Sequence, residues 1–304
     1  MPIALQVLRN ELVPGLFDVR GAYDMIPRQW DKIYKTHKSN MVVERSTQMA
    51  FLGLPFLKQE GAQTQFDNEA GERFVWNMEP YEVALGYAIT RKAILNNLYR
   101  AQFNPTNLKL ADSFAQFKEI QAASIFNTGT VAITGLGGDN QPLFSNVHPM
   151  DTGSWSNIFA TPLSLNESSL LQMQINVRTG FFTERGLKVL ARMRRLVVPP
   201  ALDPVAARLL KTELRPGTAD NDINAILTTA GGIPDGHIVL DFLTSNFAWF
   251  GTTNIEGLIH LQRVPFEMDM WVDNITDNLL VKGYEYFGFF YNDPRCAFAS
   301  YPTS

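Results

Sequence analysis

The chain has 304 residues, of which 45% are apolar and 18% are charged, and its formal net charge is −4. This composition predicts about two packed domains, with one elaborate domain as the alternative, and it excludes a disordered chain. The negative charge argues against a dedicated DNA-binding protein. The single cysteine, Cys296, excludes an internal disulfide framework and an all-cysteine metal site. Residues 1–9 lack a signal-peptide pattern and no run of about 18 apolar residues occurs, so we expect a soluble protein made in a cytoplasm.

Residues 1–48 are predicted to form an arm rather than a domain. Proline and glycine interrupt every short apolar run, which prevents a long helix or strand. The segment is nevertheless too apolar for a solvated tail, because it contains Leu5, Val7, Leu8, Leu12, Phe17, Tyr23, Trp30 and Tyr34. Such an arm needs a surface to lie on, either its own or a neighbour's.

Residues 49–80 are predicted to form a long projecting hairpin. The apolar residues 51–57 lead to Glu60-Gly61, and the segment Phe66–Glu72 has the composition of a turn. The segment Phe74–Trp76 then begins the return strand.

Next in the chain, the segment Tyr81–Ile89 alternates apolar and polar residues, as a half-buried strand does. Thr90 is expected to cap a short helix over residues 91–99. A long helix is expected to follow, with Asn104 as N-cap, Pro105 at the first helical position and its end at Asn127.

This long helix has two distinct faces. Its polar face contains Lys109, Asp112, Ser113, Gln116 and Glu119, and its apolar face contains Leu108, Leu110, Ala111, Phe114, Ala115, Phe117, Ala122, Ile125 and Phe126. At 1.5 Å per residue the helix would be about 33 Å long, enough to cross a small domain. We therefore interpret it as a spine on which other layers pack.

Residues 129–263 are predicted to combine loops, helices and short strands. The segment Gly129–Gly153 is loop-rich with a short strand at Val131–Ile133, and Asn166–Val177 has the pattern of a capped amphipathic helix. A buried strand at Leu196–Val198 is broken by Pro199-Pro200, and Asp203-Pro204 opens a helix through Leu210. Further strands or short helices are expected at Ile238–Leu240, Phe247–Gly251 and Leu258–Leu261.

The chain ends in two segments, Val264–Val272 and Leu279–Phe290, that alternate as antiparallel strands do. Asp273-Asn274 and Asp277-Asn278 mark the connection between them. No internal repeat or low-complexity segment occurs. The overall prediction is a mixed α+β architecture.

Enzyme chemistry has little support in this sequence. The glycine-rich segment Gly135–Asn140 follows a short predicted strand, but the helix and the Lys-Ser/Thr pair of a phosphate-binding loop are absent after it, so a plain glycine turn is favoured. The four histidines lack the spacing of a metal site, and no nucleophile motif occurs. Cys296 is interpreted as a small apolar filler near a strand end.

One stretch, residues 181–195, is basic, with Arg185, Lys188, Arg192, Arg194 and Arg195 against the single acid Glu184. It is either a solvated loop or a contact with phosphates or an acidic neighbour, and we favour intersubunit pairing over DNA contact. The acidic hairpin residues offer the opposite charge. The candidate intersubunit contacts are Trp30, Phe56, Asp67, Glu69, Glu72, Arg185, Arg192, Arg194 and Arg195.

Four segments carry a family resemblance: Tyr81–Arg91, which ends in Leu85-Gly86-Tyr87-Ala88-Ile89-Thr90-Arg91; Leu143-Phe144-Ser145-Asn146-Val147-His148-Pro149; Leu196-Val197-Val198-Pro199-Pro200-Ala201-Leu202; and Tyr286-Phe287-Gly288-Phe289-Phe290-Tyr291-Asn292-Asp293-Pro294-Arg295. With the order of parts, they resemble the major capsid proteins of tailed bacteriophages with the Hong Kong 97 fold, and more narrowly the Mu-like major head subunits. The likeness covers nearly the whole chain as short segments.

The resemblance implies an α+β Hong Kong 97-like capsid fold. Its parts would be an N-arm (1–48), an extended E-loop hairpin (49–80), a peripheral domain with the spine helix (81–164), an axial domain (165–263) and C-terminal strands returning to the peripheral domain (264–304). It implies a structural head protein that assembles into pentamers and hexamers, forming an icosahedral shell around double-stranded DNA bound without sequence specificity. No enzymatic activity, cofactor, metal or membrane is expected. The expected location is the virion, after assembly in the bacterial host cytoplasm.

Scaffold, portal and decoration proteins are further expected partners. No long helical scaffolding segment precedes the arm, so we expect any scaffold to be a separate protein or already removed. Lys58 lies in the hairpin, but its surroundings do not indicate a crosslink. The alternatives are an encapsulin-type nanocompartment shell, a tail or connector ring protein and, more remotely, a nucleotide-binding enzyme.

Overall fold

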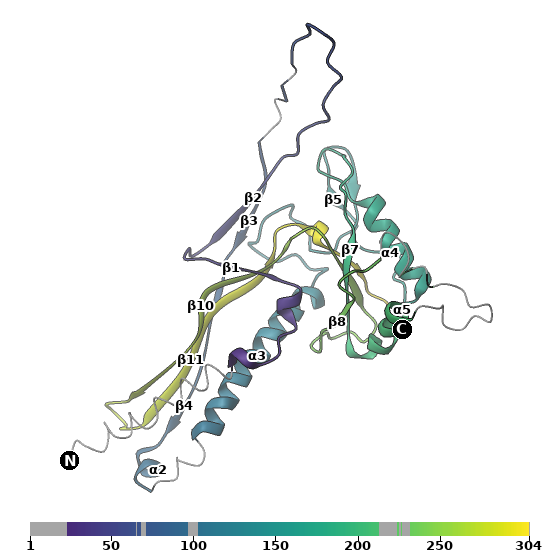
Figure 1. Ribbon diagram of the computed structural model, residues 1–304. Helices are drawn as coiled ribbons and strands as arrows, with labels where there is room; N and C mark the ends of the chain where they lie inside the picture. Colours follow the sequence, from purple (N-terminus) through teal and green to yellow (C-terminus); the bar gives the residue numbers. More distant parts are fainter. Residues whose placement is uncertain are drawn as a thin grey trace.

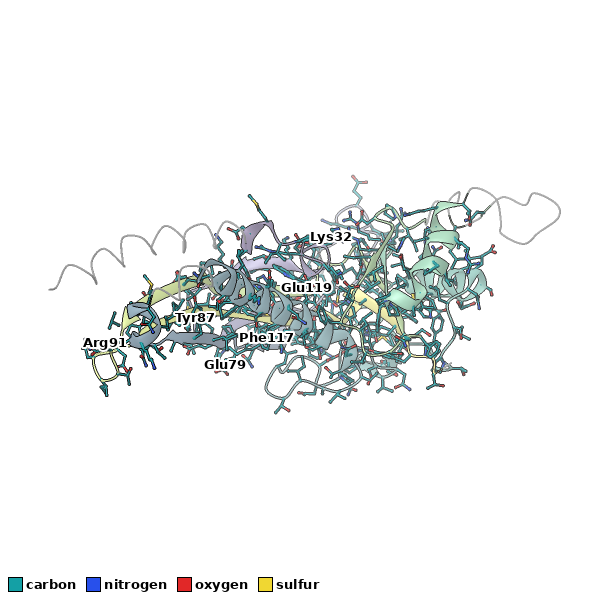
Figure 2. The ribbon with its side chains drawn as sticks, turned by 90° about the horizontal axis from the view of Figure 1, so that it is seen from below. Lys32, Glu79, Tyr87, Arg91, Phe117 and Glu119 are labelled. Atoms are coloured by element: carbon teal, nitrogen blue, oxygen red, sulfur yellow. The ribbon has the colours of Figure 1, made fainter. Side chains whose placement is uncertain are left out.

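The computed structural model describes residues 23–64, 66, 67, 71–96, 103–212, 224, 226 and 232–303. The described part of the chain is elongated and thin, with a long sheet at one end and a second, shorter sheet at the other (Figures 1 and 2). In Figure 2, Arg91 lies at the far end of the long sheet and Glu119 lies near the middle of the molecule. Within the described residues, no helix has the length and apolar character needed to cross a membrane.

The long sheet contains the N-terminal strand β1 (Lys35–Lys38), the C-terminal strands β10 (Leu258–Val272) and β11 (Leu279–Tyr291), and β4 (Tyr81–Ile89), in the order β1-β10-β11-β4. β1 pairs with β10 in parallel, and the other pairs are antiparallel. β4 and β11 confirm the predicted strands. β10 corrects the sequence analysis, because the two segments expected at Leu258–Leu261 and Val264–Val272 form one strand with register shifts between Gln262 and Glu267.

The spine helix α3 (Phe103–Asn127) lies against β11 (Figure 1). It begins one residue before the expected N-cap Asn104 and ends where predicted. Phe114 and Phe126 are buried as expected, whereas Leu108 is exposed. Lys118 is buried although it is charged, which periodicity does not reveal.

Residues 23–34, which we call the strap, cross the spine helix and the edge of the long sheet. The strap includes the 3-10 turn η1 (Trp30–Lys32) and buries Tyr23, Trp30 and Tyr34. The backbone N–H of Gln29 donates to Glu119 Oε1 at 2.7 Å, and the Tyr34 hydroxyl donates to the Ala122 carbonyl at 2.7 Å. This part of the arm therefore lies on the surface of its own subunit. Residues 1–22 lie outside the described residues.

The second sheet has the order β12-β9-β7-β8, formed by β7 (Met193–Val198), β8 (His237–Val239), β9 (Trp249–Thr253) and β12 (Ala297–Ser300). Helices α4 (Glu167–Gly180) and α5 (Asp203–Lys211) pack their apolar side chains against it. α4 begins with the expected cap, because the Asn166 side chain accepts from the Ser169 N–H at 2.8 Å and the Ser169 hydroxyl accepts from the Asn166 N–H at 2.9 Å. The turns η2 (Pro200–Leu202) and η3 (Pro294–Cys296) follow β7 and precede β12.

Smaller elements complete the described fold. The expected short helix is α2 (Arg91–Leu95), and Thr90 caps it by accepting from the Ala93 N–H at 3.3 Å; the rest of its predicted range, from residue 97, lies outside the described residues. The strand predicted at Val131–Ile133 does not form. Its place is taken by turns, followed by an isolated bridge between Gly137 and Trp76. A short pair of strands, β5 (His148–Pro149) and β6 (Ser154–Trp155), comes later in the chain.

Candidate assembly surface

A hairpin leaves the body of the molecule at one corner (Figure 1). Its two strands are β2 (Glu44–Met49) and β3 (Glu72–Met78), which pair in antiparallel fashion. β2 begins before residue 49, the predicted start of the hairpin. Residues 51–57 are not part of a strand. We call residues 50–71 the projecting loop, of which residues 65 and 68–70 are outside the described set.

The projecting loop carries apolar side chains in solvent. The side chain of Phe56 is 78% exposed. The other apolar side chains of the loop are also exposed, namely Phe51, Leu52, Leu54, Leu57 and Phe66. The chain reverses at Gln59–Ala62, where the Ala62 N–H donates to the Gln59 carbonyl at 3.1 Å. The turn expected in Phe66–Glu72 includes residues 68–70, which lie outside the described residues. Exposed apolar side chains gathered in one projecting segment make this segment a candidate for protein–protein contact.

The outgoing arm of the loop is fixed at its base. The Phe51 N–H donates to Glu184 Oε1 at 2.8 Å, and this carboxylate belongs to a residue that is only 4% exposed. The Arg295 guanidinium lies over the Phe51 ring at 5.5 Å from its centroid. Asp293 holds Arg295 through several hydrogen bonds and raises the pKa of its guanidinium against the opposing effect of burial.

The return arm is fixed by charge. Both carboxylate oxygens of Asp67 accept from the Arg185 guanidinium, and Asp67 Oδ2 also accepts from the Gly53 N–H at 2.8 Å. Further down, Arg73 pairs with Asp151. Of the opposite charges that the sequence suggested for intersubunit pairing, Asp67 and Arg185 therefore meet within one subunit.

The glycine-rich segment Gly135–Asn140 supports the base of the hairpin. The Gly138 N–H donates to the Val75 carbonyl at 2.8 Å, and the Asn77 N–H donates to the Leu136 carbonyl at 2.7 Å. Gly138 has φ +74°, and a Cβ on it would stand 2.3 Å from the Trp76 ring. No helix follows the segment in residues 141–166, and the Gly138 N–H is bonded to β3, so the arrangement is not that of a phosphate-binding loop.

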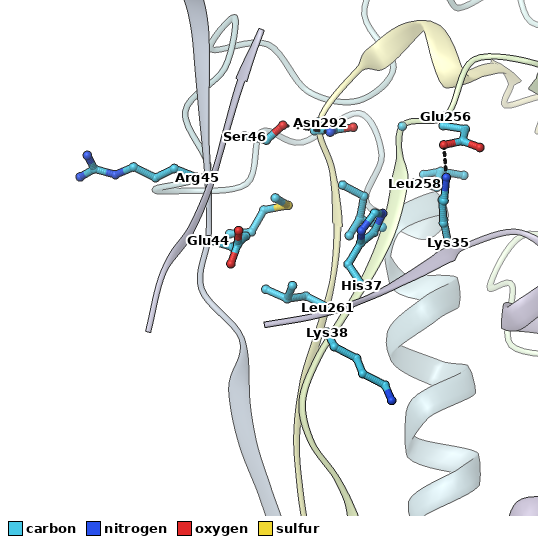
Figure 3. A pocket seen from close by; sticks show the side chains of 13 residues that line it. Lys35, His37, Lys38, Glu44, Arg45, Ser46, Glu256, Leu258, Leu261 and Asn292 are labelled. Atoms are coloured by element: carbon cyan, nitrogen blue, oxygen red, sulfur yellow. Dashed lines mark hydrogen bonds and ion pairs between the residues drawn. The ribbon is translucent and has the colours of Figure 1, made fainter. Parts of the chain in front are cut away.

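A groove of about 340 Å³ separates the hairpin from the long sheet (Figure 3). Lys35 and Glu256 form an ion pair at 2.5 Å on one side, and Asn292 Nδ2 donates to the Ser46 hydroxyl at 3.0 Å on the other. His37 also lines it. The partner of the Ser46 hydroxyl is thus an amide, which cannot act as a general base. In the described part of the chain, no three His, Cys, Asp or Glu side chains are grouped to hold a metal ion.

The other candidate contact residues have different settings. Trp30 is 4% exposed and packs on His260 and Phe289, so its side chain belongs to its own core. Glu72, Arg192 and Arg194 are exposed, with Arg194 pairing to Asp235 at 3.1 Å, and Arg195 lies 3.7 Å from the same carboxylate. Glu69 lies outside the described residues.

Sequence reasoning missed the residues that hold the loop, namely Arg73, Asp151, Glu184 and Arg295, together with the exposed Leu54, Leu57 and Phe66. Glu184 had one available signal, since it is the single acid in a basic stretch. Cys296 fills a buried position beside β12 as predicted, and burial raises the pKa of its thiol.

Comparison of the structure with solved structures gives the same fold in several shell proteins. A structure from Microbacterium phage Oxtober96 is 9% identical in sequence, covers 90% of this chain and 91% of its own, and has a TM-score of 0.54. The procapsid of bacteriophage JBD30 is 10% identical with coverages of 100% and 77% and a TM-score of 0.52. The SrpI encapsulin complex of Synechococcus elongatus PCC 7942 is 12% identical with coverages of 91% and 88% and a TM-score of 0.52. These likenesses establish the Hong Kong 97-like α+β fold.

Comparison of the sequence identifies the family. No curated protein matches the chain. The family model described as "Phage capsid protein" matches residues 79–300, which are more than two thirds of the chain. They contain the spine helix, the second sheet and the strands β4, β10 and β11 of the long sheet. The chain therefore belongs to the phage capsid protein family and is a shell-forming structural protein of the Hong Kong 97-like fold.

Proposed function

We propose that this protein is the major head subunit of an icosahedral phage shell built from pentamers and hexamers around double-stranded DNA. The carrying observation is the projecting loop, whose exposed Leu54, Phe56 and Leu57 lie outside a core that is complete without them. Apolar side chains on a protruding segment are an aggregation hazard in a monomer and an interface in a lattice. Repeated contacts of modest strength are sufficient to close a stable shell.

The proposed division of the chain follows from this function. Residues 1–48 would be the N-arm, residues 49–80 the E-loop, residues 81–164 with the C-terminal strands from 264 the peripheral domain, and residues 165–263 the axial domain. The continuity of β10 from Leu258 favours moving the last boundary a few residues toward the N-terminus. Membership in the Mu-like group remains a prediction.

The remaining parts of the proposal concern partners. A closed, DNA-filled head has portal, scaffold and decoration proteins as candidate partners, and its assembly would take place in the host cytoplasm. We infer a structural role without catalysis or cofactor, because the chain belongs to a family of capsid proteins.

Electron microscopy and sedimentation of the purified full chain test this proposal. Closed shells, or rings of five and six, are the expected result. A compact monomer that does not assemble at any concentration or salt would overturn the proposal. If shells form, residues 50–71 should lie at the boundaries between subunits, and this position would identify the loop as an intersubunit contact.

The likeness to the encapsulin complex favours one second candidate, a nanocompartment shell that encloses protein. The contents of particles isolated from the natural host distinguish the two. Nuclease-protected double-stranded DNA supports the phage head, whereas a stoichiometric enclosed protein without DNA supports the nanocompartment.

A further inference from the structure

The last backbone hydrogen bond joining the two arms of the projecting loop, among the described residues, links the Ala50 N–H to the Gly71 carbonyl at 2.8 Å. Beyond this point the loop has no regular strand. A segment of this kind samples many directions unless other contacts restrict it, and each direction it can adopt adds to the entropy lost on docking. The residues that restrict it therefore affect assembly without touching a neighbour.

One carboxylate joins three parts of the molecule at the base of the loop. Asp67, on the return arm, accepts a hydrogen bond from the Gly53 N–H on the outgoing arm. It also accepts bidentate hydrogen bonds from the Arg185 guanidinium, which belongs to the body of the subunit. The Asp67 side chain is 25% exposed and that of Arg185 is 13% exposed. Bidentate guanidinium–carboxylate contacts fix orientation as well as distance, and partial burial protects them from screening.

A second contact lies beside the first. Phe51 is held through its N–H by Glu184, the residue immediately before Arg185, and through its ring by Arg295. The turn carrying both residues is itself rigid, since the Gly186 N–H donates to the Thr183 carbonyl at 3.0 Å and the Leu187 N–H donates to the Thr183 hydroxyl at 3.0 Å. The two arms of the loop thus attach to one preformed turn.

We propose that Asp67 and Arg185 form a latch that sets the direction of the projecting loop in the free subunit, so that its apolar side chains are pre-oriented for a neighbouring copy. This inference rests on the proposed function, because it takes the loop to be an intersubunit contact. The two residues act through the loop and are positioning residues. The latch makes assembly faster because the loop is ordered before it docks.

Charge reversal tests the latch. Asp67→Arg and Arg185→Glu each break it, and the double variant Asp67→Arg/Arg185→Glu restores an opposite-charge pair. In unassembled subunits, chymotrypsin cleavage within the loop should rise about tenfold in each single variant, as expected for loss of a charged hydrogen-bonded pair, and fall back in the double variant. The initial rate of assembly, measured by light scattering, should fall in each single variant and recover in the double variant.

Two further variants make the test specific. Lys188→Glu is the matched control, because Lys188 is exposed in the same basic stretch and lies outside the loop contacts. Asp67→Asn keeps an acceptor for the Gly53 N–H and removes the charge, so it should loosen the loop less than Asp67→Arg does. If the double variant does not fold, the cleavage rate of Asp67→Asn tests the latch in its place.

Three results would overturn the latch: single variants cleaved at the wild-type rate, single variants that behave like Lys188→Glu, or a folded double variant that shows no recovery. Failure of the wild-type chain to assemble would refute the proposed function instead. The cleavage measurement would still report on the latch in that case, so the two failures are distinguishable.

Discussion

The Lys118 ammonium on the spine helix and the Glu285 carboxylate on β11 form an ion pair enclosed by the protein, with 3% and 0% of their side chains exposed. The Tyr23 hydroxyl of the strap donates to the other Glu285 oxygen at 3.3 Å. Burial lowers the pKa of Lys118 and raises the pKa of Glu285, in both cases against the effect of the partner. The pair joins strap, helix and sheet at one point, and desolvation offsets much of its attraction.

Removing one member of this pair should be far worse than removing both. Lys118→Met leaves a buried carboxylate without its cation and should reduce the free energy of unfolding by about 3–5 kcal/mol. The double variant Lys118→Met/Glu285→Met should recover most of that loss, because a buried pair contributes little net stability. Guanidinium unfolding of unassembled subunits measures both. Lys109→Met, at an exposed position of the same helix, is the control; a single variant no worse than this control would contradict the prediction.

His260 should make the subunit less stable in mild acid. Burial, followed by the nearby charges of Lys118 and Arg28, lowers the pKa of His260 from 6.5 to about 3. The unfolded chain therefore takes up this proton below pH 6.5 while the folded chain does not, and His260 contributes a loss of stability as the pH falls from 6.5 toward 3. The slope is about 1.4 kcal/mol per pH unit, or about 2 kcal/mol by about pH 5.

The measurement compares unfolding free energies of the wild type and His260→Phe across this range. The difference between the two curves separates the effect of His260 from that of Glu285. The raised pKa of Glu285 increases stability as the pH falls, which is opposite to the effect of His260. His37→Phe, at an exposed position on β1, is the control for replacing a histidine by phenylalanine. Parallel curves for wild type and His260→Phe would show that the histidine does not titrate as argued.

Local patterns predicted the elements of this fold well. Alternation identified β4, periodicity identified the spine helix, and capping chemistry located the start of α4 at Asn166, because each signal is written in neighbouring residues. The family resemblance supplied the arrangement of these parts. The long strand β10 was divided because its register shifts interrupt the alternation near Pro265.

Long-range partners could not be predicted in the same way. Asp67 and Arg185 are separated by 118 positions, and a charge pattern alone does not tell whether such residues meet within one subunit or between two. Lys118 and Glu285 are likewise buried by tertiary packing, although charged residues are ordinarily placed at the surface. Trp30 was assigned to an interface from its position in the arm, whereas its apolar side chain lies in the core of its own subunit.

The glycine at position 138 should be essential to the base of the hairpin. Alanine there meets two penalties: a left-handed backbone that costs about 1–2 kcal/mol, and a Cβ placed 2.3 Å from the Trp76 ring. Gly135→Ala is the matched control, since Gly135 has φ +83° and no atom near its Cβ position. Gly138→Ala should therefore lower the unfolding temperature clearly more than Gly135→Ala and alter tryptophan fluorescence. Equal effects would show that the Trp76 contact is unimportant.

The projecting loop should be required for assembly and dispensable for folding. Phe56→Ser and Leu57→Ser remove apolar side chains that solvent already surrounds, so the free energy of unfolding should stay within about 0.5 kcal/mol of wild type. If these side chains are buried by a neighbour, each substitution forfeits about 1.5–3 kcal/mol per subunit contact, and the concentration needed for assembly should rise about tenfold or more. Sedimentation across a concentration series measures it. Val131→Ser, an exposed apolar position away from the loop, tests whether the effect is local; loop variants that assemble like wild type would place the intersubunit contact elsewhere on the subunit.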